Sequence, residues 1–104
     1  MLYHLEFTVG YGAEMSQQDL FRIWVDEAVA ALDAKKAGAV VDLWKVAGER
    51  RVIAILDVDG PDTLDQVSLD LPIMSRMGQH VQIKVAALRR YESFAADVKE
   101  RFKG

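Results

Sequence analysis

The order in which strand-like and helix-like patterns of apolar residues follow one another along the chain constrains its fold most strongly. Residues 2–9 alternate apolar and polar side chains, as a strand with one polar face does. A helical pattern then begins at Ser16, which has the spacing of a capping box with Asp19, and ends at Gly38. Farther on, the sequence predicts strands 40–46 and 52–58 joined by the turn 47–50, a shorter helix that begins near Pro61 and stops at Pro72, a loop with Met74, Arg76 and Gly78, and a strand at 81–88.

This β-α-β-β-α-β order predicts an α+β fold: a ferredoxin-like sandwich in which both helices cover one face of an antiparallel four-stranded sheet. The chain has 104 residues, 51% of them hydrophobic, which is enough for one compact domain with a core. We assign residues 1–91 to that domain. Residues 92–104 are expected to form a terminal helix or a tail, and a helix would present Phe94, Val98 and Phe102 to a neighbouring subunit.

The sheet face turned away from the helices predicts that two subunits associate. The odd residues of the first strand are apolar and suit the helix layer, so His4 and Glu6 face away from it. The strand at 52–58 is apolar on both faces. Because an uncovered apolar sheet face is typical of an interface, we expect two sheets to pack face to face across a cavity, as in a dimeric α+β barrel.

Within the first helix, Glu27 is a carboxylate on the apolar side. At about 100° per residue, it falls among apolar residues, whereas its neighbour Asp26 points with the solvated ones. Burial raises the pKa of a carboxyl group, and a base poised closer to neutrality suits proton transfer. The alternative is that Glu27 lies at the edge of this side and reaches water or pairs with an Arg or Lys. The apolar side comprises Leu20, Ile23, Trp24, Ala28, Ala31 and Leu32, widened by Phe21 and Val25.

Composition excludes several classes of function. The chain has no cysteine, so it has no disulfide, thiol nucleophile or zinc-thiolate site. Its net charge is −3 and it has no basic stripe, so nucleic acid is not an expected partner. No segment approaches the roughly 20 apolar residues that span a membrane, and we expect a cytoplasmic protein that does not bind membranes. The two histidines, His4 and His80, are far apart in the predicted topology, so no metal site is expected within one subunit.

Five short segments, taken in order, carry a family resemblance: Met1-Leu2-Tyr3-His4, Asp26-Glu27, Leu43-Trp44-Lys45-Val46-Ala47-Gly48, Asp57-Val58 and Leu71-Pro72. Over residues 1–91 the chain resembles muconolactone Δ-isomerases. The resemblance implies the ferredoxin-like fold, sheet-to-sheet dimers that assemble into larger rings, and catalysis without a cofactor. It also implies conversion of muconolactone to the 3-oxoadipate enol-lactone by movement of a proton along the allylic system.

The resemblance also implies roles for individual residues. Glu27 matches the family's helix glutamate and is the candidate general base. The dienolate oxygen needs a donor, for which His4, the indole N–H of Trp44 or a backbone amide are available. Family members commonly carry a lysine where this chain has Trp24, one turn before Glu27. We take Glu27 and His4 as the candidate catalytic residues, and Trp24, Trp44 and Arg76 as the candidate substrate-binding residues.

Two further departures from the family pattern predict an altered substrate. Ile73–Met77 replaces an aromatic-proline segment, and Arg89-Arg90-Tyr91 replaces an Arg-His-Pro signature. The first hypothesis for the function is a cofactor-independent isomerase that moves a proton in an unsaturated lactone or enone. The second is an eliminating enzyme, such as a dehydrohalogenase, that uses the same base without returning the proton. The third is a non-catalytic binding or assembly module. Each is expected to act on or bind a small molecule as a homodimer or larger homo-oligomer.

Overall fold

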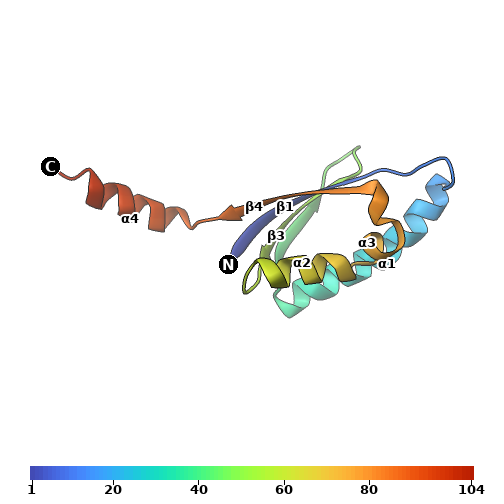
Figure 1. Cartoon of the computed structure of the whole chain (residues 1–104), viewed down its shortest axis with the longest axis horizontal. Helices are drawn as coiled ribbons and strands as arrows, with labels where there is room; N and C mark the ends of the chain where they lie inside the picture. The colour runs from blue at the N-terminus through green and yellow to red at the C-terminus, as the bar shows by residue number, and fades with distance from the viewer.

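The computed structural model describes all 104 residues and shows a two-layer body from which one helix projects (Figure 1). The four strands form one antiparallel sheet in the order β2-β3-β1-β4, and α1 and α2 lie on the same side of it. This arrangement confirms the predicted ferredoxin-like α+β sandwich. In chain order the elements are β1 (Leu2–Val9), α1 (Gln17–Ala37), β2 (Val40–Lys45), β3 (Arg51–Asp57), α2 (Pro61–Asp70), α3 (Pro72–Met77), the 3₁₀ helix η1 (Gly78–His80), β4 (Val81–Leu88) and α4 (Tyr91–Arg101).

Helix α1 begins and ends where the sequence supplies caps. The backbone N–H of Asp19 donates to the hydroxyl of Ser16, and the backbone N–H of Ser16 donates to the carboxylate of Asp19, both at 3.1 Å. At the other end Gly38 takes the left-handed conformation, with φ of 93°, which costs least without a Cβ. Both ends of the 21-residue helix are therefore fixed, and with them the direction in which Glu27 points.

The pairing register assigns each strand residue to one face of the sheet. Most odd-numbered residues of β1 are buried against the helices, as the alternation predicts. Directly opposed residues of paired strands share a face. Lys45 opposes Val52 on the helix side, whereas Trp44 opposes Ile53 on the outer side. His4 belongs to the even residues of β1 and opposes Ile55 and, as expected, the end of β4.

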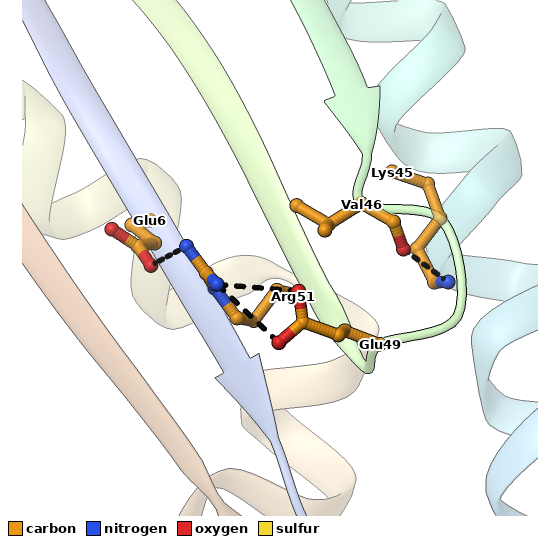
Figure 2. A network of polar contacts seen from close by, with 5 residues as sticks. All are labelled: Glu6, Lys45, Val46, Glu49 and Arg51. Carbon is orange, nitrogen blue, oxygen red and sulfur yellow. Dashed lines mark hydrogen bonds and ion pairs between the residues drawn. The ribbon is translucent and has the colours of Figure 1, made fainter.

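The outer face of the sheet is apolar at its centre and charged toward one end. Ile53 and Ile55 are half-buried there although no helix covers them. Figure 2 shows the charged end, where Arg51 of β3 lies 2.6 Å from Glu6 of β1 and 3.4 Å from Glu49 of the turn before it. The guanidinium Nε of Arg51 is buried without a hydrogen-bond partner. An apolar centre bordered by charged residues is typical of a surface that packs against another protein surface.

The segment from Pro72 to His80 was predicted to be a loop, but it is helical in the structure. It forms the short helix α3 and then η1. Pro72 not only stops α2 but also supplies the preorganised first residue of α3. Ile73 and Met77, four residues apart, then fall on one side of α3 and are buried at 3% and 0% exposure. The sequence predicted only the first of these two roles of Pro72.

The apolar side of α1 is also narrower than predicted. Phe21 and Val25, which the helical phase adds to that side, are 46% and 63% exposed. Leu32 is 55% exposed. Only a central strip of the predicted apolar side, which includes Leu20 and Glu27, is buried.

Helix α4 projects away from the body, so the chain extends 63 Å along its longest axis against 26 and 22 Å along the others (Figure 1). Of the two alternatives for the end of the chain, the structure shows a helix. None of its residues is buried, and Tyr91, Phe94, Val98 and Phe102 are exposed along its length. No helix in the structure combines the length and hydropathy that a membrane span requires.

Candidate functional site

A cavity of about 270 Å³ lies between α1 and the helix-facing side of the sheet. It lies within one chain, on the opposite side of the sheet from the outer face. The cavity expected between two subunits on that outer face stays a prediction. Its wall is almost entirely apolar, and Glu27 and Lys45 are the only charged residues that line it. The other principal lining residues are Leu5, Phe7, Trp24, Ala28, Ala31, Leu32, Leu43, Val52, Ala54, Leu56, Val67, Ser68, Leu71 and Ile73.

Glu27 is the buried carboxylate of this cavity. The residue is 9% exposed and forms no ion pair, so it neither reaches out to water nor joins an Arg or Lys of this chain. Instead, the backbone N–H of Ile73, in the first turn of α3, donates to its Oε1 atom at 3.0 Å. That N–H has no partner within its own helix, so the carboxylate satisfies it much as a capping side chain would.

Two opposing effects set the pKa of Glu27. Burial raises the pKa because the charged form loses its hydration, and the hydrogen bond from Ile73 lowers it by favouring the charged form. Burial is the larger effect, so the pKa of Glu27 is raised above its ordinary value. A carboxylate with a raised pKa is a stronger base than an exposed one once it is ionised.

The second carboxylate oxygen of Glu27 forms no hydrogen bond with the protein. One oxygen is thus held by α3 while the other has no partner in the protein, and Glu27 lines the cavity. This arrangement fixes the orientation of the carboxylate and leaves an atom that can accept a proton from a bound molecule. The apolar wall excludes water that would compete for it.

The other predicted site residues divide between the cavity and the surface. Trp24 lines the cavity one turn from Glu27, and its ring stacks on Phe21 with centroids 6.0 Å apart. Trp44 borders the cavity at the edge strand β2, but it is 53% exposed and opposes Ile53. We therefore assign its indole to the outer face and not to the cavity interior.

His4 and Arg76 do not line the cavity. His4 lies on the outer face of β1, with the sheet between it and Glu27. Arg76 is exposed on α3, and its guanidinium lies 2.6 Å from Asp26, the surface neighbour of Glu27. The structure thus brings Glu27 and Trp24 together and separates both from His4 and Arg76.

Three polar groups of the site did not emerge from the sequence. Lys45 could have been recognised, because strand alternation places it on the same face as the core residue Leu43. Ser68 lies on α2, where its hydroxyl donates to the carbonyl of Leu64 at 2.9 Å, and nothing in its surroundings distinguishes it from an ordinary helical serine. The N–H of Ile73 has no sequence signal at all. No group of three His, Cys, Asp or Glu side chains suited to a metal ion occurs in the chain.

Comparison with known proteins gives a consistent result across sequence and structure. The family model described as muconolactone delta-isomerase matches residues 1–94. The chain is 31% identical over 97 residues to muconolactone Delta-isomerase 2 of Acinetobacter lwoffii, covering 93% of this chain and 97% of that protein.

Two solved structures share the fold. A crystal structure of muconolactone isomerase matches with a TM-score of 0.72 at 26% identity, over 86% of this chain and 90% of the other. A 5-chloro-2-hydroxyhydroquinone dehydrochlorinase from Burkholderia phenoliruptrix matches with a TM-score of 0.63 at 10% identity, over 89% and 98% of the two chains. At that identity the second likeness concerns the fold alone.

Proposed function

This chain belongs to the muconolactone Δ-isomerase family, a family of intramolecular isomerases, and from that premise we propose that it moves a proton within an unsaturated lactone with Glu27 as the general base. One observation carries the proposal: a buried carboxylate with one oxygen held and the other free faces an apolar cavity. We extend the substrate class to related products of aromatic ring cleavage, because the cavity lining differs from the family pattern at Trp24.

A single carboxylate can perform both halves of such a reaction. In an α,β-unsaturated lactone, Glu27 would remove the proton from the γ carbon, and the electron pair of that C–H bond would delocalise through the double bond onto the carbonyl oxygen. The protonated Glu27 would then deliver the same proton to the α carbon, which moves the double bond and restores the carboxylate. Atoms and electrons balance without a cofactor.

The raised pKa of Glu27 assists the return of the proton as well as its removal. An exposed glutamate is a weak base at neutral pH, whereas a desolvated one holds the proton long enough to return it. Within one chain the dienolate oxygen would find its donors in the indole N–H of Trp24 and the ammonium of Lys45, which line the cavity, because the hydroxyl of Ser68 already donates to the carbonyl of Leu64. His4 lies across the sheet, so we leave it out of the mechanism within one subunit.

We further propose that the protein works as a homo-oligomer. The outer face of the sheet presents Ile53 and Ile55 without a covering layer, and Trp44 extends that apolar area to the sheet edge. Helix α4 adds a second apolar strip that its own body does not bury. Two such surfaces in a chain of this size are typical of a subunit and not of a monomer.

The proposal is tested by incubating the purified protein with muconolactone and a panel of substituted butenolides. Double-bond migration, followed by proton NMR and ultraviolet absorbance above the uncatalysed rate, is the expected result. A chlorinated lactone included in the panel distinguishes elimination, because only an eliminating enzyme releases chloride in proportion to turnover. Binding without conversion of any member of the panel would contradict the isomerase proposal and favour a binding module.

A further inference from the structure

Lys45 is the only cationic residue that lines the cavity. It is the last residue of β2, and its pairing with Val52 places it on the side of the sheet that faces α1. Lys45 is exposed to solvent and lines the cavity, as Leu32 and Trp44 do, so the cavity opens beside these residues. A molecule that enters there meets the charge of Lys45.

The position of Lys45 along the sheet can be compared with that of Glu27. Helix α1 ends at Ala37 and β2 begins three residues later, and the ion pair of Lys35 with Asp42, at 3.0 Å, holds the two elements side by side. Lys45 lies five residues into β2, roughly 16 Å from its start at about 3.3 Å per residue. Glu27 lies ten residues back from the end of α1, about 15 Å at 1.5 Å per residue. The two charged residues thus lie at similar distances along α1 and β2 from the connection between these elements, and both line the cavity.

No carboxylate of the chain neutralises Lys45. Its ammonium group donates to the carbonyl of the adjacent Val46 at 2.8 Å and forms no ion pair (Figure 2). In contrast, the nearby Arg51 pairs with both Glu6 and Glu49 on the opposite face of the sheet. Two of the three donor hydrogens of the Lys45 ammonium thus remain available for an anion.

We propose that Lys45 binds a carboxylate substituent of the substrate at the cavity opening and so makes the site specific for anionic lactones. This inference rests on the proposed function, which places the lactone ring of the substrate at Glu27. The inference adds that the carboxylate substituent of the same substrate binds to Lys45. The apolar wall on the cavity side lowers the effective dielectric constant there, which strengthens the attraction between the ammonium and a carboxylate relative to a fully hydrated pair. Binding by Lys45 also explains how the site can accept an acidic substrate although Trp24 occupies the position on α1 where family members commonly carry a lysine.

The alternative role for Lys45 is protection of an edge strand. Strand β2 is at the edge of the sheet, and an exposed lysine there discourages pairing with another chain. That role requires no ligand and no discrimination between charged and neutral molecules. A comparison of the affinities for a charged ligand and its neutral analogue therefore distinguishes the two roles of Lys45.

The test uses a non-reactive pair of ligands, 5-oxotetrahydrofuran-2-ylacetate and its methyl ester, with binding measured by calorimetry. Wild-type protein is compared with K45M, which keeps most of the side-chain length, and with K36M as the matched control. Lys36 is exposed on α1, does not line the cavity, and also lacks an ion pair. Wild type and K36M should bind the acid at least about tenfold more tightly than the ester, and K45M should bind both alike.

Equal binding of acid and ester by wild type, no binding of either, or an acid preference that survives in K45M would overturn the inference. Turnover is measured separately with muconolactone. If the acid preference depends on Lys45 but no lactone is converted, the proposed isomerase function fails while the anion site stands. If lactones are converted but K45M keeps the acid preference, the anion site fails while the function stands.

Discussion

At the scale of single residues, two adjacent acids in α1 have different environments. Asp26 lies at the surface beside Arg76, and Glu27 lies in the cavity wall beneath α3. The helical phase was sufficient to predict this separation from the sequence. The helical phase could not predict the hydrogen-bond donor to Glu27, because that donor is a backbone N–H of a residue 46 positions away in the sequence. It also could not predict the ion pair between Arg76 and Asp26.

The raised pKa of Glu27 predicts the acidic limb of the pH–rate profile. The base acts when ionised, so kcat/KM should fall as the pH drops through the pKa of Glu27. Because burial raises that pKa above the ordinary 4.5, the fall should be centred at a higher pH than for an exposed glutamate. Steady-state rates from about pH 4 to about pH 8 measure this. A profile that remains flat down to the ordinary value would contradict a desolvated base.

The same pKa predicts an effect of Glu27→Gln on stability. Between the ordinary pKa and the raised one, the folded state binds more protons than the unfolded state, so wild-type stability should decline as the pH rises through this window. Glutamine carries no charge to desolvate and its amide oxygen can still accept from Ile73. The variant should therefore be more stable than wild type above the window, by about 1.4 kcal/mol for each unit by which the pKa is raised.

Urea denaturation of both proteins below and above the window checks this expectation. The two free energies of unfolding should converge at low pH, where the carboxyl group is protonated in both states. A variant that is less stable than wild type at neutral pH would show that the hydrogen bond from Ile73, and not desolvation, dominates.

At the scale of elements, the sequence predicted every strand and the helices α1 and α2, because each has a full period and a recognisable end. It left open whether α4 is a helix or a tail. The capping box of Ser16 and the left-handed Gly38 are local features that determine α1 without tertiary contacts. Helix α3 was missed for the opposite reason. Its six residues are too few to show a period, and its formation depends on burial of Ile73 and Met77 against α1 and the core.

Ser16→Ala tests whether the N-terminal cap of α1 contributes to stability without affecting catalysis. The substitution removes the acceptor for the N–H of Asp19 and should lower the free energy of unfolding by about 1 kcal/mol. Ser16 is exposed and outside the cavity wall, so kcat and KM at a temperature well below unfolding should stay unchanged. Chemical denaturation and kinetics on the same preparation give both values. A fall in kcat would indicate that the start of α1 is coupled to the cavity.

At the scale of the whole molecule, the chain leaves two apolar areas uncovered, the outer sheet face and α4. The sequence predicted the first from the apolar character of the strand at 52–58 and the second from the spacing of Phe94, Val98 and Phe102. The alternation did not reveal the cavity beneath α1, because it shows which residues face the helices but not how closely α1 packs on them. The cavity expected between the sheets of two subunits stays a prediction.

Ile55→Lys tests the outer sheet face as an interface between copies. Ile55 is at the centre of this face, and a buried lysine without a partner is costly, so the variant should have a smaller mass than wild type. Light scattering after size exclusion measures the mass, and circular dichroism checks the fold. Val29→Lys, at a position of α1 that is 57% exposed, replaces an apolar residue with the same change of charge and serves as the control. An Ile55→Lys protein that retains the wild-type mass would exclude this face.

The central claim, that Glu27 carries the proton, is tested most directly by the turnover of muconolactone by Glu27→Gln and Asp26→Asn proteins beside wild type. Each variant neutralises one acid of the adjacent pair, and Glu27→Gln keeps the acceptor for the N–H of Ile73. We predict that Glu27→Gln lowers kcat by about 10² to 10⁴-fold while it still binds the saturated lactone acid. Asp26→Asn should remain within about threefold of wild type, as expected for a surface group. A folded Glu27→Gln protein that turns over muconolactone at the wild-type rate would contradict the account.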